Sequence, residues 1–217
     1  MLSGATFRRQ CFEAASPPPW RIAQPWQRRK ELWGEDGEHD ILNGERSTQK
    51  ETDAVTQRME IEQRVRGVLA GLGVPYEVIT IDAAYADTAA FCERYGFPLD
   101  HSANTIIVSS KKEPRQYCAC LVLATTRLDV NHTVRKLMGV SRASFASAED
   151  TMALTGMMIG GVTVFALPRE LPIYIDEMIM SLDYVILGGG SRSLKIKLSP
   201  EVLQRLPNTH IVGSLSI

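Results

Sequence analysis

The sequence has little that would support a metal centre or a reactive cysteine. Its 217 residues include four cysteines and four histidines. No two cysteines form a CxxC pair, and the histidines form neither HxxxH nor HExxH, so the spacings typical of zinc sites are missing. No cysteine stands beside a histidine or a helix start of the kind that lowers a thiol pKa. We therefore expect no metal, no other cofactor and no cysteine nucleophile, and we read the cysteines as free thiols in a reducing compartment.

Long apolar runs and a strong charge of one sign are also missing. No run approaches the ~18–20 apolar residues that span a bilayer; the segment Met178–Leu187 is too short and contains Asp183. The formal net charge is −1, which argues against a strongly basic DNA-binding protein. We expect no membrane and no DNA partner, whereas contact with only the end of an RNA stays open.

Two stretches of the chain differ in composition. Residues 1–54 contain three consecutive prolines and all three tryptophans, with a basic first half and an acidic second half. We interpret 1–54 as a disordered N-terminal extension. An arginine-rich, acid-poor start is also compatible with an organelle transit peptide, although Glu13 and the lack of an amphipathic face favour a plain extension. Residues 55–217 are regular and form the expected folded domain.

The folded part mixes helices and strands without strict alternation. Apolar residues at helical spacing, caps and turn residues predict helices over 55–73, Thr88–Tyr95, Asn131–Met138, Ala148–Leu154 and Pro200–Leu206. Alternating or β-branched runs predict strands over Tyr76–Ile81, Asn104–Ser109, Tyr117–Ala124, Val162–Ala166, Ile173–Ile175, Tyr184–Leu187 and Leu194–Leu198. This order predicts an α+β fold with a mixed sheet rather than a doubly wound one.

Local residues predict where several of these helices start. Ser147 followed by Asp150 resembles a capping box, and Ser199-Pro200 suits the N-cap and first helical position. Asp129 is better placed to cap the following helix than to act as a general base.

Two glycine clusters lie within residues 155–197. Gly160-Gly161 and Gly188-Gly189-Gly190 each adjoin an apolar, β-rich run. Glycines allow a positive φ or a close approach of main chain to a ligand, so the pattern indicates a pocket walled by backbone. The second cluster leads into a strand rather than a helix, and the chain has neither GxGxxG after its first strand nor GxxxxGK[ST]; both facts argue against a nucleotide-phosphate cradle.

Several motifs in order resemble one known family. They are VPYEV, ANTIIV, TTRLDVNHTVRKLMGV, SFASAEDTMALTG, IGGVTVFALP, LPIYID and ILGGGSRSLKIKLSPEVL. Together they cover about residues 60–215 and resemble the YbaK/prolyl-tRNA synthetase-associated domain family. The resemblance implies an α+β fold with a mixed, partly barrel-like sheet and surrounding helices.

The resemblance also implies a function. Family members hydrolyse the ester that joins a wrong amino acid to a tRNA, so we expect a trans-acting aminoacyl-tRNA deacylase in the cytoplasm. Its partners would be the acceptor end of aminoacyl-tRNA and, in addition, an aminoacyl-tRNA synthetase. The resemblance implies catalytic roles for Asn104, Thr105, Gly160 and Gly161. It implies substrate binding by Thr163, Val164, Gly189, Gly190 and Arg192, the last three on the wall opposite the Gly160-Gly161 loop.

Three positions depart from the family pattern. Asn104 stands where members commonly carry a lysine thought to anchor a substrate phosphate, and Lys111 or Lys112 could take over part of that role. The proline that usually closes the Gly-Gly loop is absent. Lys195 replaces a common acidic residue, which either suits an RNA end or marks a solvated strand face.

These departures keep two further hypotheses open. One is a module with little or no catalytic activity that binds aminoacyl-tRNA or a synthetase. The other is a hydrolase of small-molecule esters on the same fold.

Overall fold

The computed structural model describes residues 39–217, and side chains from Thr52 onward. The predicted extension over 1–54, with its tryptophans and Cys11, falls mostly outside this part, but the first helix, α1, begins at His39 rather than near Val55. Residue contacts divide the chain into two units, residues 1–44 and residues 45–217, and the second unit contains both sheets. No helix in the described part is long and apolar enough to cross a membrane.

The elements alternate irregularly along the chain. The longer helices are α1 (His39–Leu72), α2 (Thr88–Tyr95) and α4 (Ala148–Thr155); a π-helical turn η3 (Val130–Val134) continues into α3 (Arg135–Leu137). Short 3-10 helices are η1 (Ala83–Tyr85), η2 (Leu99–His101), η4 (Glu177–Ser181) and η5 (Pro200–Arg205). The strands are β1 (Tyr76–Thr80), β2 (Ala103–Ser110), β3 (Tyr117–Leu123), β4 (Ala143–Phe145), β5 (Ile173–Asp176), β6 (Val185–Gly188), β7 (Leu194–Leu198) and β8 (Thr209–Val212).

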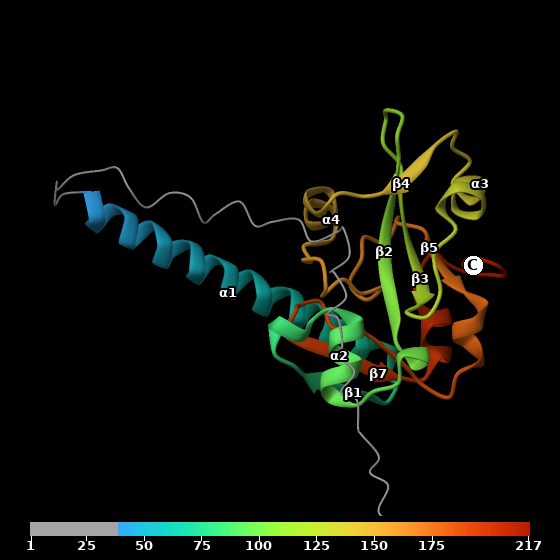
Figure 1. The fold of residues 1–217 in the computed structure, drawn as a ribbon, viewed down its shortest axis with the longest axis horizontal. Coiled ribbons are helices and arrows are strands. Elements are labelled where there is room, and N and C mark those ends of the chain that lie inside the picture. Colours follow the sequence, from blue (N-terminus) through green and yellow to red (C-terminus); the bar gives the residue numbers. More distant parts are fainter. Residues whose placement is uncertain (1–38) are drawn as a thin grey trace, which may run out of the picture. The chain divides into compact units, whose positions relative to one another are not determined.

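The strands form two sheets, neither of which closes into a barrel. The smaller, antiparallel sheet has the order β1-β7-β6. The larger has the order β4-β2-β3-β5-β8, with antiparallel pairs around β2 and parallel pairs on both sides of β5. Figure 1 shows the long β2–β3 hairpin running across the direction of β1 and β7. The α+β class with a mixed sheet is thus confirmed, and only the barrel-like description is loose.

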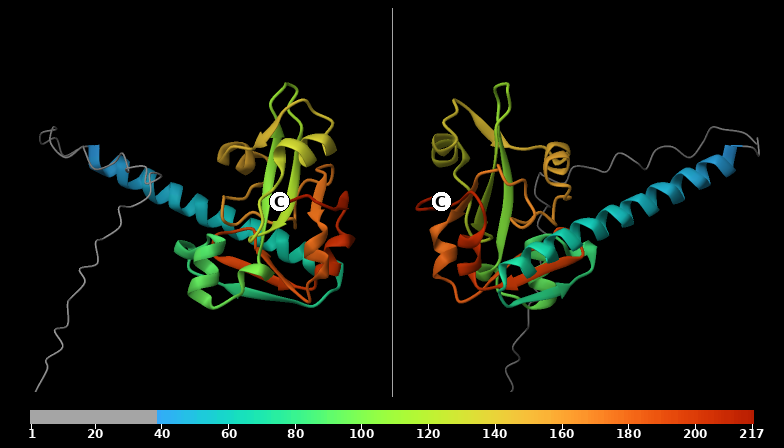
Figure 2. Two further views of the ribbon diagram at one scale, coloured as in Figure 1. Left: turned by 45° about the vertical axis from the view of Figure 1, so that its right-hand side comes forward. Right: turned by 180° about the vertical axis from the view of Figure 1, so that it is seen from behind.

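Successive side chains of a strand point to opposite faces of its sheet. The buried apolar residues on these faces form three separate clusters. The main core lies between the two sheets and takes Ile61, Val65 and Leu69 from α1. A second cluster covers the opposite face of β2 and β3 and contains Cys118 and Cys120, whose sulfurs lie 3.9 Å apart. The third packs α2 against the outer face of the small sheet. The two views in Figure 2 show α2 against the small sheet and the β2–β3 hairpin beside it.

Two of the predicted caps, Ser147 and Asp129, are present, and Asp87 is a further cap that the sequence analysis did not predict. Asp87 Oδ1 accepts from the backbone N–H groups of Ala89 and Ala90 and so begins α2. Ser147 Oγ accepts from the Asp150 N–H, as the capping box predicts. Asp129 accepts from the N–H groups of His132 and Thr133, which confirms its capping role.

One predicted strand is wrong, one predicted helix is of the 3-10 type, and two strands were missed. Residues 162–166 form a buried loop rather than a strand: the segment is apolar and enclosed, as a buried strand would be, but its backbone joins no sheet ladder and Ala166 has φ +61°. Pro200–Arg205 is a 3-10 helix, and Ser199 gives it no side-chain cap. β4 and β8 have no signal in the sequence, since both are short and mostly exposed.

Candidate active site

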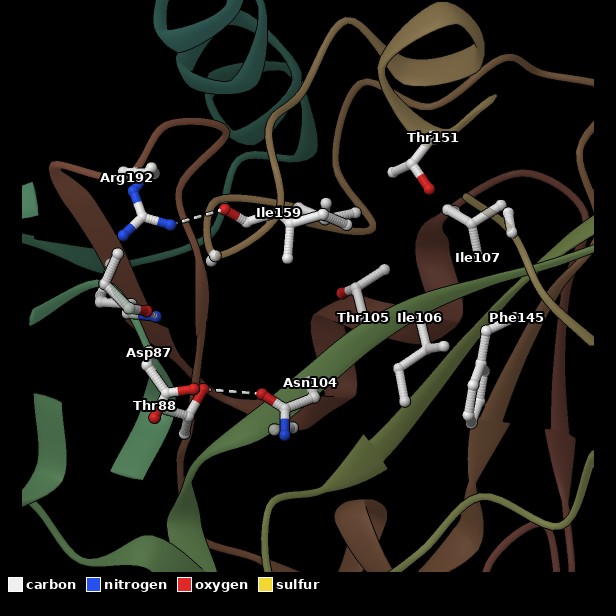
Figure 3. Close-up of a pocket in the computed structure, with 17 residues that line it drawn as sticks. Asp87, Thr88, Asn104, Thr105, Ile106, Ile107, Phe145, Thr151, Ile159 and Arg192 are labelled. Carbon is white, nitrogen blue, oxygen red and sulfur yellow. Dashed lines mark hydrogen bonds between the residues drawn. The ribbon is translucent and has the colours of Figure 1, made fainter. Parts of the chain in front are cut away.

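One cavity of about 420 Å³ lies between β2, the start of α2, the loop after α4 and the β6–β7 region. Figure 3 shows its two sides: Asp87, Thr88 and Arg192 on one, and Ile106, Ile107 and Phe145 on the other. Phe145 and Ile159 are more than half exposed although they line the cavity, so they mark its mouth. The cavity is therefore open to solvent, polar on one side and apolar on the other.

Asn104 and Thr88 join β2 to the start of α2 inside this cavity. Thr88 Oγ1 donates a hydrogen bond of 2.6 Å to Asn104 Oδ1. Because Asp87 caps α2 beside it, Thr88 is held at the first helical position. This bond fixes the direction of the Asn104 amide, whose N–H₂ group is left to donate to a ligand.

Thr105 follows Asn104 on β2 and has an unusual side chain. Its Oγ1 is buried and has no hydrogen-bond partner, although the residue lines the cavity. A buried hydroxyl without a partner is rare and calls for an explanation. A ligand in the cavity is one partner that would satisfy it.

The Ile159-Gly160 loop is held over the cavity by Arg192. Arg192 Nη1 donates to the Ile159 carbonyl at 2.9 Å, and Nη2 donates to the Ala83 carbonyl at 3.0 Å. Gly160 has φ +91°, and a Cβ there would lie 2.8 Å from Arg192 Nη1. Only glycine therefore suits both the backbone conformation and the position of the guanidinium.

The two glycine clusters contact each other directly. The Gly190 N–H donates to the Gly161 carbonyl at 2.9 Å. A Cβ on Gly161 would come within 2.5 Å of the Ser191 carbonyl carbon, and one on Gly188 within 2.3 Å of the Val162 carbonyl oxygen. The two clusters are therefore packed together on one side of the cavity, and their predicted placement on opposite walls is wrong.

The structure brings together four of the predicted site residues: Asn104, Thr105, Gly160 and Arg192 all line the cavity. The others do not line it. Thr163 and Val164 are buried in the core beneath the loop. Gly161 and Gly189 lie behind the cavity wall, and Gly190 lines a second cavity of about 250 Å³ next to α1, which shares Arg192 with the first.

Lys195 is the main residue that sequence reasoning misplaced. It does not lie on a solvated strand face: only 5% of the residue is exposed, and it lines the cavity. Its Nζ donates to the Ala86 carbonyl at 2.8 Å. Burial lowers its pKa from 10.5 to about 8, partly offset by the charge of Asp87. Lys111 and Lys112, considered as replacements for a lysine at 104, are exposed in the β2–β3 turn.

The lining residues include no cysteine, histidine or serine, and the described part of the chain has no group of three or more His, Cys, Asp or Glu that could hold a metal ion. The site instead offers threonine hydroxyls, the Asn104 amide, backbone groups of a glycine loop and one buried ammonium. Such a set can bind and polarise a reactive substrate and orient a water molecule. Among its lining residues there is no serine or cysteine that could serve as the nucleophile.

The chain is similar to known proteins over its folded part. Residues 82–206 match the model of the aminoacyl-tRNA editing domain. A curated relative, the candidate Cys-tRNA(Pro)/Cys-tRNA(Cys) deacylase EbsC of Enterococcus faecalis, is 27% identical over 73 residues. That match covers 34% of this chain and 44% of EbsC, so the chain spans less than half of the length of this relative.

Solved structures share the fold. The crystal structure of a hypothetical protein has a TM-score of 0.64 and 22% identity, covering 71% of this chain and 99% of that one. The structure of a candidate trans-editing enzyme for prolyl-tRNA synthetase has a TM-score of 0.61 and 24% identity, covering 70% of this chain and 94% of that one. The family model spans more than half of the sequence, including the cavity-lining strands and loops, and the chain therefore belongs to the aminoacyl-tRNA editing domain family.

Proposed function

We propose that the protein is a trans-acting aminoacyl-tRNA deacylase, which hydrolyses the ester of a mischarged tRNA. The observation that carries the proposal is the cavity: in an editing-domain fold it collects polar side chains and backbone groups without a serine, cysteine or histidine. Such a set of functional groups suits a substrate whose carbonyl carbon is already activated toward attack by water. An aminoacyl ester reacts with water, and the hydroxyl next to it on the ribose can assist, so the protein has mainly to position the ester and stabilise charge.

The residues that line the cavity and those behind it would have different roles in hydrolysis of the ester. The Asn104 amide, fixed by Thr88, would bind the ribose or the attacking water, and the Thr105 hydroxyl would gain its missing partner. Backbone groups of Gly160 would hold the aminoacyl carbonyl. Gly161, Gly189 and Gly190 would keep this loop in place through main-chain packing rather than touch the substrate.

The apolar side of the cavity would take the amino-acid side chain. Ile106, Ile107 and Phe145 line this side. A pocket of this kind selects by size, and one methylene is worth only ~1–3 kcal/mol of discrimination. We therefore expect small amino acids to be released fastest and the cognate amino acid to be excluded by its bulk.

The partners follow from the same chemistry. The acceptor end of a tRNA is the part that must enter the cavity, and an aminoacyl-tRNA synthetase is the proposed source of the mischarged product. The reaction belongs in the cytoplasm, where translation supplies both. The names of the similar proteins, which refer to Cys-tRNA and to prolyl-tRNA synthetase, support Cys-tRNA(Pro) as the first substrate to try.

The test is a panel of mischarged tRNAs. Purified full-length protein is incubated with tRNA(Pro) charged with cysteine, alanine or serine, and with correctly charged Pro-tRNA(Pro). We expect release of at least one small amino acid well above the spontaneous rate, and none from Pro-tRNA(Pro). Binding of the charged tRNAs without any release would instead identify a binding module, and release from simple esters alone would identify a small-molecule esterase.

A further inference from the structure

Lys195 projects from the middle of the small sheet into the cavity. It lies on β7, the central strand, opposite Ile79 of β1 and Gly188 of β6. Its neighbours Leu194 and Ile196 point to the other face of the sheet. On its own face, the ammonium lies 5.5 Å from the ring centre of Phe91 of α2. The aliphatic stem is thus enclosed under α2, and the ammonium emerges where α2 begins.

The hydrogen-bonding capacity of this ammonium is only partly used. A lysine ammonium has three donors, and the Ala86 carbonyl takes one of them. No ion pair within 4.0 Å between described residues includes Lys195. Two N–H groups are therefore left for a ligand at the floor of the cavity.

The other two charged residues of the cavity are already engaged. Arg192 donates to the Ile159 and Ala83 carbonyls and holds the loop. Asp87 Oδ1 caps α2. Among the charged residues that line the cavity, Lys195 is the one that is buried and still has N–H groups without an acceptor.

Lys195 and the glycine loop converge on the same neighbour, Ala86. The Lys195 Nζ is 2.8 Å from the Ala86 carbonyl oxygen. A Cβ on Gly160 would lie 3.3 Å from the Ala86 Cβ. An ester carbonyl held by the Gly160 loop would therefore lie on the same side of the cavity as the ammonium.

We propose that Lys195 is a catalytic residue, whose ammonium binds the ester carbonyl oxygen and stabilises the negative charge that this oxygen gains during hydrolysis. This role rests on the proposed deacylase function. The water oxygen forms a bond to the carbonyl carbon, and the carbonyl electron pair moves onto the oxygen beside Lys195. When the pair returns, the bond to the ribose oxygen breaks, and that oxygen takes up the proton lost by water. The products are the free amino acid and the ribose hydroxyl.

The cost of burying Lys195 agrees with such a role. Enclosing an ammonium without a carboxylate partner destabilises a fold. A methionine would fill the same space without this cost. A residue that costs stability at the floor of a cavity is typical of a functional site.

Lys197 provides a matched control. It is on the same strand and the same face as Lys195 but is partly exposed, pairs with Glu77 at 3.7 Å and lies over the ring of Tyr184. Lys195→Met and Lys197→Met therefore remove the same charge from the same strand, inside and outside the cavity. Lys195→Arg keeps the charge inside the cavity.

The experiment measures kcat and KM of the full chain on the mischarged tRNA that the panel shows to be deacylated fastest. Loss of one group that stabilises this charge lowers kcat by roughly 10²–10³-fold. We expect that loss for Lys195→Met, with KM nearly unchanged, whereas Lys197→Met stays within about threefold of wild type. Lys195→Arg should keep much of kcat. Binding of an amide-linked analogue, 3′-cysteinylamido-3′-deoxyadenosine, should weaken by no more than about threefold in Lys195→Met, because its neutral carbonyl oxygen gains far less from the ammonium than the charged oxygen of the transition state does. Such a small loss would show that the cavity is intact.

The outcomes separate this inference from the proposed function. If the wild type releases amino acid and Lys195→Met does so at the same kcat, or with only KM raised, Lys195 is not the catalytic cation while the deacylase function stands. If the wild type releases nothing from any tRNA, both the role of Lys195 and the deacylase function are overturned.

If Lys195→Met does not fold, the pH profiles of the wild type and Lys195→Arg decide. The wild-type kcat should stop rising above a pH of about 8, while the kcat of Lys195→Arg keeps rising. Identical profiles would overturn the role.

Discussion

Gly190 donates its backbone N–H to the carbonyl of Gly161 across 2.9 Å, so the two glycine segments are joined main chain to main chain. Their glycines are needed because neighbouring backbone occupies the space where side chains would begin. The cavity wall behind the Gly160 loop is thus a fixed packing arrangement, and the loop derives its position from it.

Gly161→Ala should disrupt this wall. The new Cβ would lie 2.5 Å from the Ser191 carbonyl carbon, and overpacking of this kind costs about 1–3 kcal/mol. We expect the free energy of unfolding to fall by about that much in denaturant titrations, and deacylation to be lost. Gly71→Ala, in α1 with no atom near its Cβ position, is the control and should be neutral or stabilising. Equal behaviour of the two variants would show that the glycine contact is unimportant.

The substitution Thr105→Val should lower the deacylation activity without lowering the free energy of unfolding. The Thr105 hydroxyl is buried without a partner, so its removal should leave the free energy of unfolding unchanged or raise it by about 1 kcal/mol. If the hydroxyl binds substrate, kcat/KM should fall about tenfold. Thr209→Val removes another unpartnered buried hydroxyl, on β8 away from the cavity, and should give the same stability change with full activity. Full activity in Thr105→Val would remove this residue from the site.

Sequence reasoning predicted the parts of the site that depend on local pattern. The strand that carries Asn104 and Thr105 has a β-branched pattern, and the glycines of the loop are explicit in the sequence. Lys195 was misplaced because its environment comes from elsewhere: α2, far away in sequence, covers the outer face of β7. The strand predicted over 162–166 was wrong for the same kind of reason, since tertiary packing encloses an apolar segment whose backbone does not pair.

Asn104→Lys tests whether the cavity has room for a second cation. The substitution removes the acceptor of the Thr88 hydroxyl and places a like charge in the cavity that holds Lys195. We expect kcat/KM to fall about tenfold in deacylation assays. In the double variant Asn104→Lys/Lys195→Met, the new lysine should restore part of the activity lost in Lys195→Met, a non-additive effect that coupled residues produce. An activity gain in the single variant would mean that the cavity lacks a cation and that Lys195 does not supply it.

The pH dependence of stability should report the burial of Lys195. Its pKa is lowered from 10.5 to about 8 in the folded protein, so the unfolded chain binds more protons between these values and wild-type stability rises with pH across this interval. Each pKa unit corresponds to about 1.4 kcal/mol, so relative to Lys195→Met the wild type should gain roughly 3 kcal/mol between pH 8 and 10.5. Urea titrations of both proteins at several pH values measure this difference. A constant difference would mean that Lys195 titrates like an exposed lysine.

The most direct test of the account is the release of amino acid from Cys-, Ala- and Ser-tRNA(Pro) by excess wild-type protein, followed in a single turnover beside Pro-tRNA(Pro) and beside a sample without protein. The cavity with its glycine loop, Asn104, Thr105 and Lys195 predicts rapid release of at least one small amino acid and no release of proline. Release at the spontaneous rate from all four tRNAs would contradict the assignment of this cavity as a deacylase site.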